Sequence, residues 1–199
     1  FNANLLPIRV FDDNGRSSTL VLQRAYARII ALCSSGAVPN LRVVNMSLGS
    51  YSESVNDAVL HQAIQLARTK YGVVTVCAGG NGQKSSDGTL APRTDPCYPS
   101  DFEECVAVTA LRADGANVYW SDYNEAKDIS APGEGIWSTY ASSDDGYAAA
   151  SGTSLSAPMV AGAFALLFAA VPNATVDEAC SAIYATAVPV AVSYTHLRA

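Results

Sequence analysis

The chain has 199 residues, of which 49% are hydrophobic and 15% are charged, and its formal net charge is −6. This length and composition predict one globular domain with a substantial core and exclude an intrinsically disordered chain. The negative charge, without any basic cluster, argues against a protein that binds nucleic-acid backbones.

The first part of the chain predicts strands and helices in alternation. Residues 5–11 (LLPIRVF) are typical of a short strand, and a helix follows from Ser18 to about Cys33. Residues 41–46 predict the second strand and residues 73–77 the third. Between them, a capping-box-like start at Ser54 predicts a helix to about Lys70. Its inner face is expected to carry Val55, Val59, Ala63 and Leu66.

The second part predicts a long polar loop and then further strands before two late helices. The loop covers residues 81–101, and residues 105–111 predict the fourth strand. Short strand candidates follow at 118–121 and 128–129, with an extended stretch at 136–140. The last helix is expected to begin at a cap near Thr175. This alternation predicts an α/β fold whose parallel sheet has helices on both faces and functional loops at the carboxyl ends of its strands.

The most informative segment is residues 151–170, SGTSLSAPMVAGAFALLFAA. A helix is expected to begin near Ser154 to Ser156, because Pro158 fits the first turn of a helix, and to run to about Val171, where Pro172 stops it. The helix is apolar all round and therefore expected to be buried, and it is too short and too rich in small residues for a membrane span. Spacing alone leaves two roles for Ser154, a helix N-cap or a nucleophile beside its own oxyanion donor.

Asn81 follows the third predicted strand, in Ala78-Gly79-Gly80-Asn81. Taken alone it is typical of a turn residue. A side-chain amide at the end of a strand can also donate a hydrogen bond to a developing oxyanion, which acyl transfer requires. A register one residue earlier would place Gly80 there instead.

The sequence Gly152-Thr153-Ser154-Leu155-Ser156-Ala157-Pro158-Met159-Val160-Ala161-Gly162 resembles the nucleophile motif of the subtilisin-like serine proteases. That family usually has Ala at Ser156, Ser at Ala157 and often His at Met159. The resemblance implies that Ser154 is the nucleophile and that Asn81 is the oxyanion donor together with the Ser154 backbone N–H. It also implies substrate binding by Ser47, Leu48, Gly49, Ala78, Gly79 and Gly80.

The same resemblance implies a subtilisin-like three-layer sandwich with a mostly parallel central sheet, truncated at its N-terminus. We expect residues 1–192 to be part of a peptidase catalytic domain and residues 193–199 to be a non-native tail. The Asp and His motifs of the family are expected upstream of Phe1. His61 lies in a predicted helix without the family's histidine context and is interpreted as a partly exposed helix residue, while His196 falls in the tail.

Five cysteines are present, at 33, 77, 97, 105 and 180, without any C-x-x-C pair that would indicate zinc. Cys97 and Cys105 flank a short loop and are candidates for a disulfide, whereas Cys77 is expected to be a buried free thiol. No cofactor is expected to be required. The resemblance allows structural calcium in the full-length protein, with the carbonyls of Ser100, Phe102 and Cys105 in the region of a weaker cation site.

The leading hypothesis is a fragment of a secreted, monomeric serine endopeptidase that acts on polypeptides and binds neither nucleic acid nor membranes. Without the Asp and His, the fragment alone is expected to be inactive. The alternative is a non-catalytic pseudoprotease that binds peptides through residues 47–49 by strand addition. A nucleotide-binding domain is disfavoured, because Gly79-Gly80-Asn81-Gly82 lacks G-x-G-x-x-G spacing and a following helix.

Overall fold

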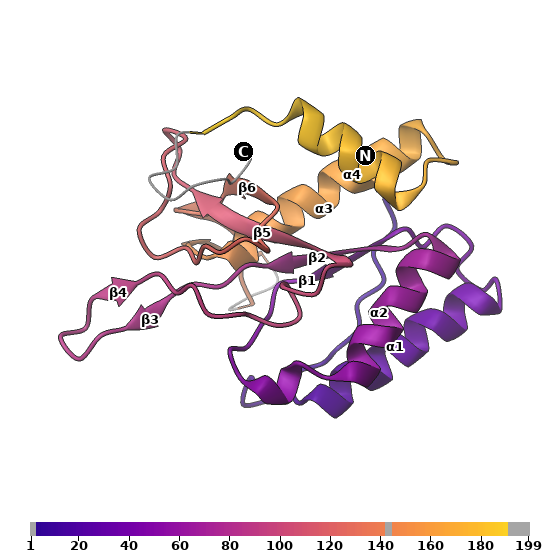
Figure 1. The fold of residues 1–199 in the computed structure, drawn as a ribbon, viewed down its shortest axis with the longest axis horizontal. Helices are drawn as coiled ribbons and strands as arrows, with labels where there is room; N and C mark the ends of the chain where they lie inside the picture. Colours follow the sequence, from indigo (N-terminus) through magenta and orange to yellow (C-terminus); the bar gives the residue numbers. More distant parts are fainter. Residues whose placement is uncertain (1–2, 142–144, 191–199) are drawn as a thin grey trace.

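The chain folds around a four-stranded parallel sheet that has helices on both faces (Figure 1). A computed structural model describes residues 3–141 and 145–190. The strands stand in the order β1 (Val43–Met46), β2 (Val74–Ala78), β5 (Cys105–Leu111) and β6 (Ile129–Pro132), and each neighbouring pair is parallel. Helices α1 (Thr19–Ser34) and α2 (Ala58–Tyr71) cover one face, and α3 (Thr153–Ala170) and α4 (Val176–Thr186) cover the other. The predicted three-layer α/β architecture is confirmed.

The pleat of the central strands explains the two cores. Successive side chains of a strand point to opposite faces of the sheet. Val74, Val76 and Ala78 accordingly pack with α3 and α4, whereas Val73 and Cys77 pack with α1 and α2. Every residue of β2 and β5 is buried, which is why both segments are almost continuously apolar.

Helix α1 begins and ends as the sequence predicts. The Ser18 hydroxyl accepts a hydrogen bond from the Val21 N–H at 3.4 Å, and Ser35 is the C-terminal cap. The helix is tied to the sheet through a buried polar contact, because the Tyr26 hydroxyl lies 2.8 Å from the hydroxyl of Thr75 on β2. Burial raises the pKa of Tyr26 well above its ordinary value, so the phenol remains neutral.

Helix α2 differs from the prediction in its start and in its inner face. Its N-cap is Asp57, whose carboxylate accepts the Leu60 N–H at 2.8 Å, and a short 3₁₀ helix η1 (Glu53–Val55) stands where the capping box was expected. The buried stripe is Leu60, Ile64 and Ala67. The predicted Val59 and Leu66 are 57% and 39% exposed. The predicted Val55 and Ala63 are partly buried and pack against the same core as Leu60 and Ile64, so the prediction is wrong for Val59 and Leu66 only.

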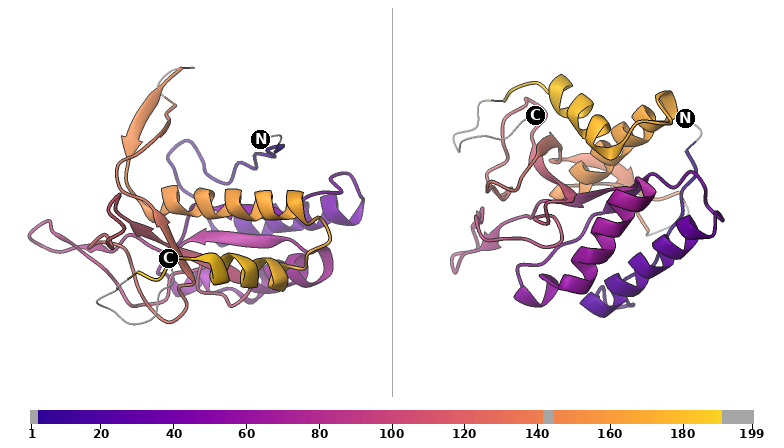
Figure 2. Two further views of the ribbon diagram at one scale, coloured as in Figure 1. Left: turned by 90° about the horizontal axis from the view of Figure 1, so that it is seen from above. Right: turned by 45° about the vertical axis from the view of Figure 1, so that its right-hand side comes forward.

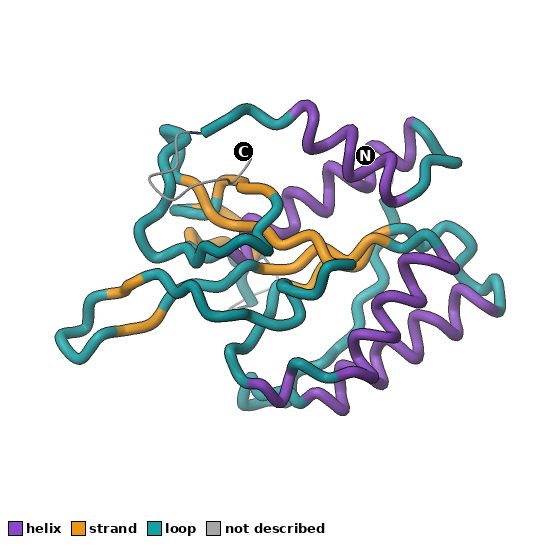
Figure 3. Tube along the Cα trace, in the orientation of Figure 1, coloured by secondary structure: helices purple, strands orange, loops and turns teal. Residues whose placement is uncertain are grey.

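Two antiparallel hairpins extend from the parallel sheet. β3 (Gln83–Lys84) and β4 (Leu90–Ala91) form one inside the predicted polar loop, and β7 (Ile136–Thr139) and β8 (Tyr147–Ala150) form the other. Figure 2 shows the second hairpin projecting away from the helices, and Figure 3 shows how much of this half of the chain is loop. Within the described residues, 118–121 form no strand. The side chains of Val118 and Trp120 extend from a turn and pack with Ala110 in a small core.

Residues 5–11 do not form the predicted strand. They run close to β1 but make no ladder with it, and a cavity of about 460 Å³ lies between the two segments. The cavity is lined on one side by Ile8, Val10 and Phe11, and on the other by Met46 and Leu48. A strand needs a hydrogen-bonded partner, and in this structure β1 pairs only with β2.

Helix α3 is apolar all round, as expected, but is buried on one side only. Val160, Phe164 and Phe168 face the sheet, whereas Met159 and Leu166 are exposed. Among the described residues, α3 is also the one helix whose length and composition would suffice to cross a membrane. Its contacts with all four strands of the parallel sheet are those of a core helix, a class that passes the same test. Helix α4 begins at the predicted Thr175, with a complete capping box to Glu178.

The candidate disulfide between Cys97 and Cys105 is not formed in this structure. All five cysteines are free thiols in this structure. Cys105 starts β5 and belongs to the core beneath α1 and α2 together with Cys77, the predicted buried thiol. The Cys97 sulfur instead lies 2.8 Å from the place where a Cβ on Gly49 would stand. The side chains of Cys97 and Cys105 thus lie in different parts of the structure.

Candidate active site

Three segments that are distant in the sequence meet at the carboxyl edge of the sheet. They are the loop after β1, the turn after β2 and the N-terminus of α3. The turn and the helix are joined by a hydrogen bond that spans 72 residues, from Thr153 to Asn81. The loop and the helix are joined by bonds that span 107 residues, between Ser47 and Ser154. Loops at this edge are where open α/β sheets bind ligands.

Ser154 is the second residue of α3 and is not its cap. The N-cap is Gly152, which has no side chain to satisfy the first N–H groups. The Ser154 hydroxyl instead donates to the Ser47 carbonyl at 3.3 Å, and the Ser47 hydroxyl donates to the Ser154 carbonyl at 2.7 Å. The long first bond leaves the Ser154 hydroxyl only weakly engaged. It is partly exposed at the positive end of the helix.

The Asn81 side chain is held against the start of the same helix. Its carbonyl oxygen accepts two hydrogen bonds of 2.8 Å, one from the Thr153 N–H and one from the Thr153 hydroxyl. Because the oxygen is engaged, the amide nitrogen is directed to the neighbouring backbone and lies 3.5 Å from the position of a Cβ on Gly152. A side-chain donor therefore stands beside the residue that precedes Thr153 and Ser154.

Thr153 was missed in the sequence, although its place directly before the candidate nucleophile was a signal. Its side chain is fully buried, and its hydroxyl also accepts the Gly80 N–H at 3.2 Å. The Thr153 hydroxyl thus binds both the side-chain amide of Asn81 and the backbone N–H of Gly80. This argues against the register that would put Gly80 in the donor position, since Gly80 contributes no side chain.

The six predicted substrate-binding residues form two neighbouring segments. Ala78 ends β2, and Gly79 donates its N–H to the Val108 carbonyl at 2.8 Å; a Cβ on Gly79 would meet that same oxygen at 2.8 Å. On the other segment, Ser47 contacts Ser154, and Gly49 lies against the Cys97 sulfur. Leu48 packs against the core beneath α1 and α2. Of the six, Ser47 and Gly80 thus contact the start of α3, whereas the Leu48 side chain packs into the core.

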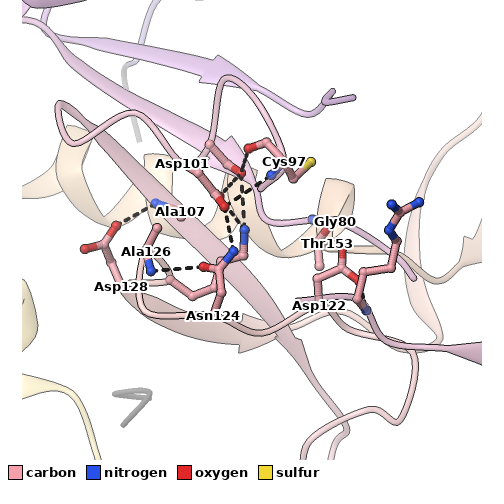
Figure 4. Close-up of polar contacts among 12 residues, drawn as sticks. Gly80, Cys97, Asp101, Ala107, Asp122, Asn124, Ala126, Asp128 and Thr153 are labelled. Atoms are coloured by element: carbon pink, nitrogen blue, oxygen red, sulfur yellow. Dashed lines mark hydrogen bonds and ion pairs between the residues drawn. The ribbon is translucent and has the colours of Figure 1, made fainter. Parts of the chain in front are cut away.

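A buried polar cluster around Asp101 adjoins the candidate site through Cys97, and Figure 4 shows it. Asp101 accepts the Cys97 N–H at 3.2 Å and the Asn124 amide at 2.7 Å, and it forms an ion pair with the buried Lys127. Burial raises the pKa of the Cys97 thiol to about 11, although the charge of Lys127 opposes the shift. Cys97 is therefore a neutral thiol at physiological pH.

Protein groups surround the carbonyls of residues 100–105, where a calcium ion was considered. The Phe102 carbonyl accepts the Cys105 N–H at 2.9 Å. The Lys127 ammonium lies 3.5 Å from the Ser100 hydroxyl, and the Arg68 guanidinium donates to the Glu104 carbonyl at 3.2 Å. Calcium binding there stays a prediction for the full-length protein. Residues 3–141 and 145–190 hold no group of three metal-ligating side chains.

His61 belongs to a different part of the molecule. It lies on α2 and is partly exposed, as predicted. Its Nε2 is 2.5 Å from a carboxylate oxygen of Glu104, and its ring stacks on Phe102 with centroids 4.3 Å apart. Ser154 is on α3, across the sheet from α2, so His61 is not the partner of that serine. His196 lies outside the described residues.

The segment that resembled a nucleotide-binding turn leads into the β3–β4 hairpin and not into a helix. It therefore lacks the helix N-terminus on which a pyrophosphate would sit.

Comparisons with known proteins find similar sequences and similar folds. The model of the subtilase family matches residues 1–197. Subtilisin DY from Bacillus licheniformis is 29% identical over 186 residues, which cover 94% of this chain and 61% of that protein. Thermitase from Thermoactinomyces vulgaris is 32% identical over 165 residues, covering 83% of this chain and 51% of thermitase. The chain thus spans less than two thirds of these relatives.

Two solved structures are similar in fold. A psychrophilic protease superposes with a TM-score of 0.74 at 27% identity. The match covers 89% of this chain and 58% of the chain of that protease. The prenylagaramide maturation protease PagA gives a TM-score of 0.73 at 26% identity. The match covers 92% of this chain and 62% of the PagA chain.

Proposed function

This chain belongs to the subtilase family, and we propose that it is the C-terminal part of the catalytic domain of a serine endopeptidase. Ser154 attacks the scissile carbonyl of a polypeptide and forms an acyl-enzyme, which water then hydrolyses. The observation that carries the proposal is the double hydrogen bond from Thr153 to Asn81, because it directs a free amide donor to the N-terminus of the helix that bears Ser154.

The oxyanion is stabilised by the Asn81 amide and the Ser154 backbone N–H. The first N–H groups of a helix have no intrahelical partner and carry partial positive charge, so they stabilise a developing negative charge. A fixed amide adds a second donor at no cost of reorganisation during the reaction. Support for this role comes from the Thr153 contacts, which hold the Asn81 oxygen and leave its nitrogen available.

The general base is supplied from upstream of Phe1. A serine hydroxyl needs a histidine to take its proton, and a carboxylate to orient that histidine. In the subtilisin order the acid and the histidine precede the serine. His61 is separated from Ser154 by the sheet and is bonded to Glu104. We therefore expect the 199-residue chain to be inactive by itself and the full-length protein to be active.

The substrate lies as an extended peptide along residues 47–49, with residues 78–80 as the facing wall. Strand addition to an exposed backbone provides such binding. Gly49 is exposed and Gly80 is partly exposed, so each segment presents one glycine at the surface. Secretion and a monomeric state complete the proposal.

The decisive test is labelling of the full-length protein with a fluorophosphonate, which modifies an activated serine. We expect labelling that is lost in Ser154→Ala and kept in Ser156→Ala, which removes a neighbouring buried hydroxyl. If the full-length protein is not labelled but still binds peptides, it is the pseudoprotease of the alternative hypothesis, and the catalytic proposal is wrong.

A further inference from the structure

We propose that Asp122, together with Tyr51, is a positioning residue for Asn81: it fixes the turn of residues 80–82 so that the amide reaches the N-terminus of α3. This inference rests on the proposed function, because it assigns a role through the oxyanion donor. Asp122 lies between β5 and β6, and no motif in the sequence marks it. Figure 4 shows it beside Gly80 and Thr153.

The Asp122 carboxylate is buried and fully engaged. It is 1% exposed. One oxygen accepts the N–H of Gly82 and that of Arg93, each at 2.8 Å, and the other accepts the Tyr51 hydroxyl at 2.5 Å. The Asp122 N–H donates in turn to the Gly80 carbonyl at 3.2 Å. One residue therefore holds the peptide on each side of Asn81.

Tyr51 reaches the same turn. Its hydroxyl, which donates to Asp122, lies 2.9 Å from the place where a Cβ on Gly80 would stand. The Arg93 guanidinium lies 4.0 Å above the Tyr51 ring and restrains it. Since Tyr51 follows the segment 47–49, the bond to Asp122 also joins the two segments around the candidate active site.

The turn needs such a clamp because glycines flank Asn81. Gly80 has φ +112° and Gly82 has φ +72°, conformations that glycine adopts at no steric cost but loses entropy to maintain. A Cβ on Gly80 would lie 2.0 Å from the Asp122 carboxylate, so the glycine also permits the close approach. Thr153 fixes the amide end of the Asn81 side chain, and Asp122 fixes the backbone from which it extends.

Burial of this carboxylate is costly. Desolvation raises the pKa of Asp122, although the bonds from Tyr51, Arg93 and Gly82 lower it. A buried charge that is bonded to two backbone N–H groups and one hydroxyl locks those groups in one arrangement, since losing any of them would leave the charge unpaired. Preorganised donors are what an oxyanion site requires.

The test is steady-state kinetics of the full-length protein on a peptide anilide with a large apolar P1 residue. In Asp122→Ala we expect kcat to fall by about 10- to 100-fold with KM changed by less than about threefold, because a misplaced donor weakens the transition state more than the ground state. Asp122→Asn should restore kcat to within about threefold, since its oxygen accepts both N–H groups and its amide can donate to Tyr51. Equal losses in both variants would overturn the proposal.

A double-mutant cycle separates positioning from general stability. In an Asn81→Ala background, Asp122→Ala should lower kcat by less than about twofold, because the donor it positions is gone. A full additional loss would contradict the proposal. Asp128→Ala is the matched control: this partly buried acid accepts the Ala107 N–H at 2.8 Å, away from the turn, and its loss should leave kcat unchanged.

If Asp122→Ala does not fold, Tyr51→Phe carries the test. It keeps the ring beneath Arg93 and removes only the hydroxyl, so kcat should fall at constant KM; an unchanged kcat would overturn the proposal. These results are distinct from failure of the proposed function, in which the unmodified full-length protein would neither cleave the anilide nor react with a fluorophosphonate.

Discussion

At the scale of the residue, a few side chains determine the geometry around Ser154. Thr153 binds the Asn81 oxygen twice, and Asp122 binds the backbone on both sides of Asn81. The glycines make room for these contacts. A motif identified Ser154 and Asn81 in the sequence, but Thr153 and Asp122 act through burial and hydrogen bonds that a single sequence does not display.

Gly80 offers a test of this close packing. In Gly80→Ala the new Cβ would lie 2.0 Å from the Asp122 carboxylate at φ +112°. Strain and displacement of the acid should lower the free energy of unfolding by about 2–4 kcal/mol, measured by urea denaturation. The control is Gly88→Ala, at φ +85° with nothing within 4 Å, where about 1 kcal/mol is expected. Equal losses would show that the contact with Asp122 is unimportant.

Ionisation of Cys97 should make the free energy of unfolding fall at high pH. Its pKa is about 11 in the folded protein and 9.0 ordinarily. The folded value is the higher one, so the neutral thiol stabilises the fold below pH 9 and this contribution is lost as the pH rises through 11. Between pH 9 and 11 the free energy of unfolding should fall by about 2 kcal/mol more than in Cys97→Ala. Burial also raises the pKa of Cys33, at a partly exposed position, so Cys33→Ala should change the slope less than Cys97→Ala does. Identical slopes in all three proteins would contradict this account.

At the scale of the element, the helices and the central strands were predictable, and their exact faces were not. Capping residues and apolar periodicity located α1 and α4 in the sequence. In α2, two adjacent apolar stripes compete, and only contact with α1 and the sheet decides between them. The segment 5–11 has the composition of a strand, but composition does not supply a hydrogen-bonded partner.

The corrected face of α2 can be tested with two neighbouring residues. Leu60 is fully buried and Val59 is 57% exposed. Leu60→Ala should lower the free energy of unfolding by about 2–5 kcal/mol because it leaves a cavity, and Val59→Ala should change it by less than about 0.5 kcal/mol. Thermal unfolding followed by circular dichroism measures both. The opposite ranking would restore the face expected from the sequence.

At the scale of the whole molecule, the parallel sheet brings together segments that lie up to 107 residues apart. The order of strands and helices predicted this convergence, because parallel strands place their carboxyl ends at one edge. The hairpins and the separate surroundings of Cys97 and Cys105 were not predictable. They depend on side-chain contacts between loops, where local sequence patterns carry little information.

The central claim is that Asn81 stabilises the oxyanion formed at Ser154, and kinetics of Asn81→Ala in the full-length protein test it most directly. Loss of one such donor lowers kcat by about 10²–10³-fold, a magnitude established on subtilisin itself and taken over unchanged. We predict a fall of that size in kcat on a peptide anilide, with KM nearly constant and the fold intact by circular dichroism. A folded Asn81→Ala protein whose kcat stays within about threefold of wild type would contradict the account.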